Sequence, residues 1–292
     1  MGVVILFMLS GFLAAYSLNV KNKNHEYTIK EYVKQRMARI YSGYLPALLF
    51  ICMIDGISFL HFSDKYSFAE GFNIQNLLIN FFMLQSTPFA FVRDGGLFGS
   101  GRPLWTLSAE WWIYMSFGAF FLIITNSLKI TYTRLLVLLF LLVTPFANLS
   151  GKPDLTFCFL LGVFAYYIYD KINLKFKSVL LILNIIIIAT YGLVFKEAYD
   201  KVIYFFVFTL LVLVMAIGKD GEMAYEGKII PFMSKYTYML YLIHYSIFYF
   251  LLNLEMNSIV SFVLGVIVSN IIAIGMYVLV EKRLFVVLKG II

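Results

Sequence analysis

Residues 101–125 read GRPLWTLSAEWWIYMSFGAFFLIIT, a short loop of glycine, arginine and proline followed by a long apolar run. A helix needs roughly 17 to 25 apolar residues to cross a hydrocarbon core about 30 Å thick, and residues 104–125 suffice. The run contains one carboxylate, Glu110. Because an ionised side chain is costly inside a membrane, the segment predicts a transmembrane helix that carries a functional residue.

The composition extends this interpretation to the whole chain. Of the 292 residues, 62% are hydrophobic and 13% are charged, whereas soluble domains are far more polar. We therefore expect an all-α, polytopic membrane helical bundle that forms a single domain over residues 1–292. No metal-binding motif or nucleotide loop occurs, so we expect no metal and no permanently bound cofactor. About nine transmembrane helices are predicted, at residues 3–18, 40–60, 104–125, 133–149, 155–169, 178–195, 201–218, 237–253 and 258–280.

A further apolar stretch, residues 77–92, is assigned by charge, because Lys and Arg concentrate in cytoplasmic loops. If this stretch does not cross, 17 of the 23 Lys and Arg residues lie on one side and 6 on the other. If it crosses, the division is 11 against 12. The first division predicts a re-entrant or surface-lying segment and a cytoplasmic C-terminus. We expect a location in the inner or plasma membrane. The net charge of +7 then requires no nucleic acid partner.

The basic segment before the second span contains signals for a helix start. Thr28 and Glu31 have the spacing of a capping box, so a helix is predicted to begin at Ile29. Arg36 and Arg39 are three residues apart and share a helical face at the cytoplasmic boundary. Guanidinium groups at this depth can bind the phosphates of a ligand, or they can anchor the helix to the head groups of the lipid bilayer.

Polar residues from three predicted spans are expected at one depth. At the rise of an α-helix, Glu110 and Asp55 each lie roughly 9 Å below the outer face, and Ser10 lies roughly 10 Å below it. Such intramembrane carboxylates are functional candidates. The alternative is a structural role, with Glu110 protonated or paired to an arginine.

A second group of candidates lies in the span at 237–253. Thr237, Tyr241, His244 and Phe248 follow one another at helical spacing and are predicted to line one face of a tunnel. A neutral His244 bonded to a neighbouring helix is the alternative, because such contacts need no chemistry. Trp105 fits an aromatic belt at the membrane interface.

Four segments, in this order, resemble motifs of acyltransferase family 3, the integral membrane acyltransferases that modify cell-envelope glycans. The segment MLSGFLAAYSL (8–18) resembles the family's FFxxSGFL helix, and QRMARIYSGYLPALL (35–49) is similar to RxxRIxPxY. LWTLSAEWWIYM (104–115) is similar to LWSLxVEWxFY, and KYTYMLYLIHYSI (235–247) is similar to SYSLYLIHxP. The chain departs from these motifs at Ser42, Ala109 and Ser246.

The resemblance implies an O-acyltransferase that uses cytoplasmic acetyl-CoA, or another acyl-CoA, as co-substrate and a hydroxyl of an extracytoplasmic polysaccharide or glycolipid as acceptor. It also implies a preceding helix with a catalytic histidine, which has no counterpart here. We therefore expect either a true start upstream of Met1 or an inactive product. The candidate residues are Glu110, His244, Tyr241 and Asp55 for catalysis, Arg36, Arg39, Ser10 and Gly11 for the acyl-CoA, and Arg102, Trp105 and Ser108 for the acceptor.

Two other functions remain open from the sequence. In a transporter or flippase for an envelope lipid or glycan, the buried carboxylates would carry protons or bind the cargo. In a catalytically inactive relative, the chain would act as a scaffold. Transfer of label from acetyl-CoA separates the enzyme from both. The acceptor, the acyl chain length and the oligomeric state are not predicted.

Overall fold

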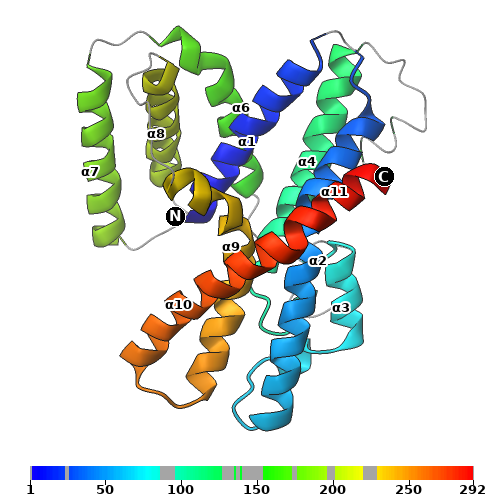
Figure 1. The fold of residues 1–292 in the computed structure, drawn as a ribbon. Coiled ribbons are helices and arrows are strands. Elements are labelled where there is room, and N and C mark those ends of the chain that lie inside the picture. Colours follow the sequence, from blue (N-terminus) through cyan, green and yellow to red (C-terminus); the bar gives the residue numbers. More distant parts are fainter. Residues whose placement is uncertain are drawn as a thin grey trace. The chain divides into compact units, whose positions relative to one another are not determined.

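The computed structural model describes residues 2–23, 26–85, 96–126, 135, 139, 154–172, 176–195, 201–219 and 229–291. Within these residues the chain is helical and contains no strand, which confirms the all-α expectation (Figure 1). The contacts divide the chain into two compact units. Unit 1 contains residues 1–27, 113–146 and 151–226, and unit 2 contains residues 28–112, 147–150 and 227–292.

Unit 1 is built around the crossing of α1 (Gly2–Lys21) with α6 (Asp154–Ile168). A Cβ atom on Gly11 would overlap the carbonyl of Phe159, and one on Gly162 would overlap the carbonyl of Met8. Because both glycines lack side chains, the two backbones can touch, as small residues permit at helix crossings in membranes. Unit 1 is completed by the second half of α4 (Leu104–Thr125), η3 (Tyr169–Lys171), α7 (Lys177–Phe195) and α8 (Lys201–Lys219).

Unit 2 contains the longest helix, α2 (Ile29–His61). Its predicted start is confirmed: the Thr28 hydroxyl accepts from the Glu31 amide at 3.2 Å, and the Thr28 amide donates to the Glu31 carboxylate at 2.9 Å. The remaining elements are η1 (Ala69–Gly71), α3 (Ile74–Phe81), the first half of α4, α9 (Ile229–Asn253), α10 (Ser258–Met276), a π-helical turn η4 (Tyr277–Glu281) and α11 (Lys282–Ile291).

Five helices of the described chain are long and apolar enough to cross a membrane. They are Gly2–Lys21, Ile29–His61, Leu104–Thr125, Lys201–Gly218 and Ser258–Gly290. The predicted span at 133–149 lies almost entirely outside the described residues. Nine crossings therefore remain a prediction, as does the single domain.

The stretch at 77–92 is described only as far as Gln85. Within that part it is not one continuous helix, because α3 ends at Phe81 and Met83 has a φ of 56°. This break agrees with the expectation of a re-entrant or surface-lying segment, since a crossing helix would continue through these residues.

Candidate functional site

A line of polar side chains runs along α9 within unit 2, and we call it the polar seam. At the rise of an α-helix, the distance along the helix axis from Tyr238 to Tyr249 is about 16 Å. Each member contacts a neighbouring segment of the same unit or the α9 backbone, so α9 is the helix that organises the site. The members are Tyr238, Tyr241, His244, Ser246 and Tyr249.

Tyr238 forms the end of the seam that lies against α2. Its hydroxyl donates to the carbonyl of Ile40 at 3.0 Å. Its ring lies so close to Gly43 that a Cβ atom there would overlap ring carbons. The glycine therefore allows the tyrosine ring to lie directly on the α2 backbone.

Charged groups from three elements gather around the Tyr238 hydroxyl, within electrostatic range: Glu110 of α4, Glu281 of η4 and Arg39 of α2. Glu281 is only 6% exposed, and its Oε2 has no hydrogen-bond partner among the described residues. It closes a π-helical turn, a distortion found frequently at functional sites. This end of the seam therefore combines two carboxylates, a phenol and a guanidinium.

The middle of the seam contains Tyr241 and His244. The Tyr241 hydroxyl and the Thr106 hydroxyl of α4 lie 2.8 Å apart. His244 directs Nδ1 to the carbonyl of Tyr241 at 2.8 Å. A carbonyl only accepts hydrogen bonds, so Nδ1 carries the proton and Nε2 of a neutral ring is left as an acceptor.

The far end of the seam is held by Asp55, which is fully buried. Its Oδ2 accepts from the Ser100 amide at 2.7 Å, and the Ser100 hydroxyl donates to the Ser246 hydroxyl at 2.7 Å. Burial, followed by the nearby charge of Asp55, raises the pKa of Tyr66 well above its ordinary value. Asp55 thus positions the loop before α4 and lies beside a tyrosine that keeps its proton.

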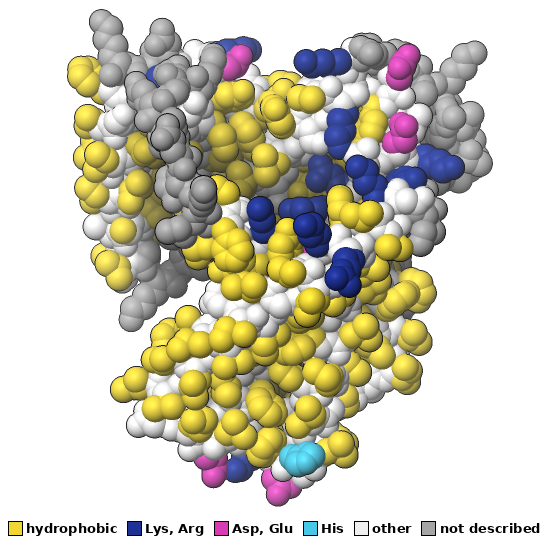
Figure 2. Space-filling model, viewed as in Figure 1, with side chains coloured by type: hydrophobic (Ala, Val, Ile, Leu, Met, Phe, Trp, Pro, Cys, Tyr) yellow, Lys and Arg dark blue, Asp and Glu magenta, His cyan; other side chains and the backbone are white. Residues whose placement is uncertain are grey.

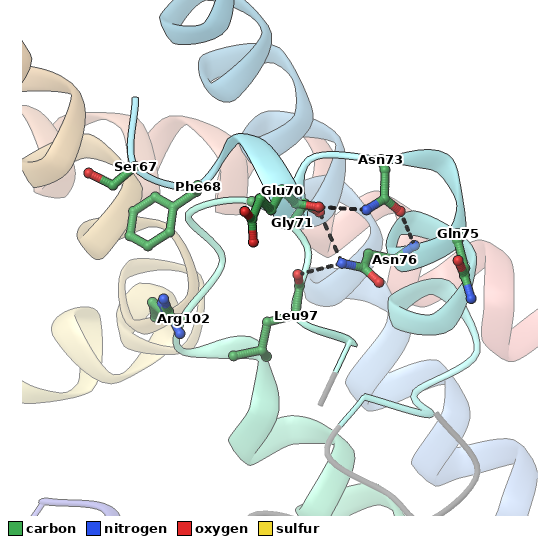
Figure 3. A pocket seen from close by; sticks show the side chains of 10 residues that line it. Ser67, Phe68, Glu70, Gly71, Asn73, Gln75, Asn76, Leu97 and Arg102 are labelled. Atoms are coloured by element: carbon green, nitrogen blue, oxygen red, sulfur yellow. Dashed lines mark hydrogen bonds between the residues drawn. The ribbon is translucent and has the colours of Figure 1, made fainter. Parts of the chain in front are cut away.

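A cavity of about 250 Å³ opens beside this loop. Figure 3 shows the Phe68 ring near the Arg102 guanidinium, with Glu70 next to it and Asn73, Gln75 and Asn76 on the other side. The guanidinium lies 4.8 Å from the centroid of the Phe68 ring. The cavity is lined by Ser67, Phe68, Glu70, Gly71, Asn73, Gln75, Asn76, Leu97, Gly99 and Arg102.

The structure separates Glu110 from Asp55 within unit 2. Gln85 donates both to the Tyr44 hydroxyl and to the carbonyl of Leu104, each at 3.0 Å, so α4 begins beside Tyr44. Glu110 consequently lies near Arg39, which is about 24 Å along α2 from Asp55. Glu110 and Asp55 therefore do not lie at one level of unit 2, because residues 96–103 fold back into the unit, where the Ser100 amide binds Asp55.

The tunnel along α9 stays a prediction, but the four residues predicted to line it do not share one environment. Thr237 is exposed and its hydroxyl donates to Ser234 of its own helix. The Phe248 ring fills the space over Gly265 of α10, whereas Tyr241 contacts α4. These side chains therefore point towards different surroundings, although their spacing places them near one face.

The other predicted residues are distributed over both units. Ser10 and Gly11 lie in the α1–α6 crossing of unit 1, where Gly11 serves the close backbone contact. The Arg36 guanidinium lies 5.5 Å from the centroid of the Tyr32 ring. Ser108 donates to the carbonyl of Met83 at 2.7 Å, so its hydroxyl supports the turn after α3. Trp105 lies half-buried on α4.

Sequence reasoning missed Glu281 and the serine pair of Ser100 and Ser246. Glu281 directly follows the span predicted at 258–280. The helix instead continues through η4 into α11. A carboxylate inside a helical run was the available signal, whereas no local pattern indicates that two serines will meet.

The helical architecture, with five described helices long and apolar enough to cross a membrane, is that of a multi-pass membrane protein. The family model described as "Acyltransferase domain" matches residues 1–278, nearly the whole chain. The chain belongs to acyltransferase family 3 and is a membrane acyltransferase. No curated protein and no solved structure matches it.

Proposed function

We propose that the protein is an O-acyltransferase that moves an acyl group, in the simplest case acetyl, from a cytoplasmic acyl-CoA to a hydroxyl of an extracytoplasmic polysaccharide or glycolipid. The polar seam is the observation that carries this proposal. It runs from the charged groups around Tyr238 to a loop that borders an open polar cavity, all within unit 2.

Positive charge at one end of unit 2 supports binding of the acyl-CoA phosphates there. Figure 2 shows Lys and Arg side chains gathered over α11 and the neighbouring part of α2, and α11 packs against α2. One guanidinium group can donate two parallel hydrogen bonds to two oxygens of a phosphate. This geometry suits the phosphates of an acyl-CoA. The Lys and Arg residues of α11 are Lys282, Arg283 and Lys289, and those of the first part of α2 are Lys30, Lys34, Arg36 and Arg39.

The transfer requires one base and one site for the developing oxyanion. The acceptor hydroxyl oxygen attacks the thioester carbonyl carbon, a C–O bond forms, the C–S bond breaks, and the hydroxyl proton ends on the departing thiolate. We assign Glu110 to hold or share this proton. His244, through its Nε2, is the second group of the seam that can accept it.

Replacement of Glu110 by glutamine tests this assignment. Glu110→Gln keeps the shape of the side chain but removes its basicity, so acyl transfer is expected to fall by about 100-fold or more. The measurement is transfer of labelled acetyl groups from acetyl-CoA to envelope glycan in membranes that contain the full-length protein.

Glu255→Gln is the matched control. Glu255 is an exposed carboxylate that pairs with Lys65 at 2.5 Å and lies outside the seam, so this variant should retain transfer. Both variants should be present in the membrane in normal amounts. Normal transfer by Glu110→Gln would refute the assignment, and movement of the acceptor without transfer would favour a transporter.

A further inference from the structure

The cavity beside Asp55 has the size and the lining of a site for a small polar ligand. Its volume of about 250 Å³ lies just below the roughly 300 to 1,000 Å³ of sites for drug-sized ligands. It therefore suits a single ring rather than an oligosaccharide. Its lining is dominated by hydroxyl, amide and charged side chains, with one aromatic ring, Phe68.

The charges of the lining indicate a neutral ligand. The lining residues include one carboxylate, Glu70, and one guanidinium, Arg102, so their charges cancel. A guanidinium donates two parallel hydrogen bonds and a carboxylate accepts two. Neighbouring hydroxyl groups of a sugar can accept the first pair and donate the second, whereas a phosphate would be repelled by Glu70.

The backbone around the cavity is held in place before any ligand arrives. The Asn76 side chain donates to the carbonyls of Gly71 and Leu97, each at 3.2 Å, which ties η1 to the loop before α4 (Figure 3). Gly99 has a φ of +49°, and Asp55 holds the next amide. Such preorganisation lowers the entropy cost of binding a weak ligand.

We propose that this cavity binds one neutral sugar ring of the acceptor glycan, with Arg102 and Glu70 as the hydroxyl-binding pair. The proposal rests on the proposed function, which supplies a glycan acceptor. It assigns Asp55 a positioning role behind the cavity wall, because its carboxylate contacts Gly99 and Ser100 from inside the unit.

Binding can be measured without any transfer reaction. We would record saturation-transfer NMR of methyl glucoside, methyl N-acetylglucosaminide and methyl glucuronide with the full-length protein in nanodiscs. The two neutral glycosides should bind with a Kd of about 1 mM. Arg102→Gln and Glu70→Gln should each weaken that binding about tenfold, because each removes a charged hydrogen-bond partner. Glu255→Gln, outside the cavity, should leave it unchanged.

Equal binding to wild type and to both cavity variants would overturn the proposal, as would binding of the glucuronide alone. The transfer assay separates this failure from failure of the proposed function. If neutral glycosides bind in the cavity but wild type transfers no acyl group, only the proposed function fails. If transfer occurs and both cavity variants keep a normal acceptor KM, only the sugar site fails. A raised acceptor KM with unchanged kcat supports both.

Discussion

At the scale of single residues, Glu281 is a buried carboxylate of the site with one oxygen that has no hydrogen-bond partner among the described residues. Arg39 acts on it electrostatically. The desolvation of a buried charge costs more free energy than an ion pair at the surface contributes. A buried carboxylate with this cost is better explained by function than by stability.

Glu281→Gln should therefore reduce acyl transfer at least tenfold while the melting temperature stays the same or rises. The amide removes the desolvated charge but keeps the size of the side chain. Transfer of labelled acetyl groups and thermal unfolding in detergent measure the two effects. Glu255→Gln provides the exposed control. A lower melting temperature combined with normal transfer would show that Glu281 is structural.

At the scale of elements, close helix contacts in both units depend on glycine. In unit 1, α1 and α6 approach through Gly11 and Gly162. In unit 2, the ring of Tyr238 occupies the space above Gly43. The contact between α1 and α6 joins two helix backbones, so neither can move away without moving its helix. The contact at Gly43 involves a side chain, the ring of Tyr238.

Gly11→Ala should destabilise unit 1 by about 1 to 3 kcal/mol, because the added methyl group overlaps the Phe159 carbonyl. Gly218→Ala is the matched control, since no atom lies within 4 Å of a Cβ added there. Thermal unfolding in detergent should show a lower transition for Gly11→Ala and no loss for the control. Equal transitions would mean that α1 and α6 do not cross at these glycines.

At the scale of the whole molecule, the sidedness of the chain decides which substrate reaches which end of the seam. The charge division predicts that the α11 end lies in the cytoplasm and that the turn between α9 and α10 lies outside. Glu255 belongs to that turn and is fully exposed, and Lys65 lowers its pKa by a direct hydrogen bond. Donor and acceptor would then approach from opposite faces of the membrane.

Single cysteines at the two ends test this sidedness. In a background with Cys52→Ser and Cys158→Ala, Glu255→Cys should react with a membrane-impermeant maleimide on intact cells. Lys289→Cys should react only after the membrane is opened. Both positions are exposed, so neither should be protected by the fold. Labelling of Lys289→Cys on intact cells would reverse the topology and the assignment of donor and acceptor ends.

The sequence by itself determined the features that depend on local chemistry. Apolar runs fix the membrane class because their length matches the hydrocarbon core, and the Thr28 and Glu31 pair fixes the start of α2. Four spaced motifs predicted the family. Only the tertiary structure decided the position of Glu110 relative to Asp55, the gathering of Arg39, Tyr238 and Glu281, and the cavity beside Asp55. These features depend on a loop that turns back into unit 2. Contacts between segments far apart in the chain produce no periodic pattern in the sequence, so they cannot be predicted from it.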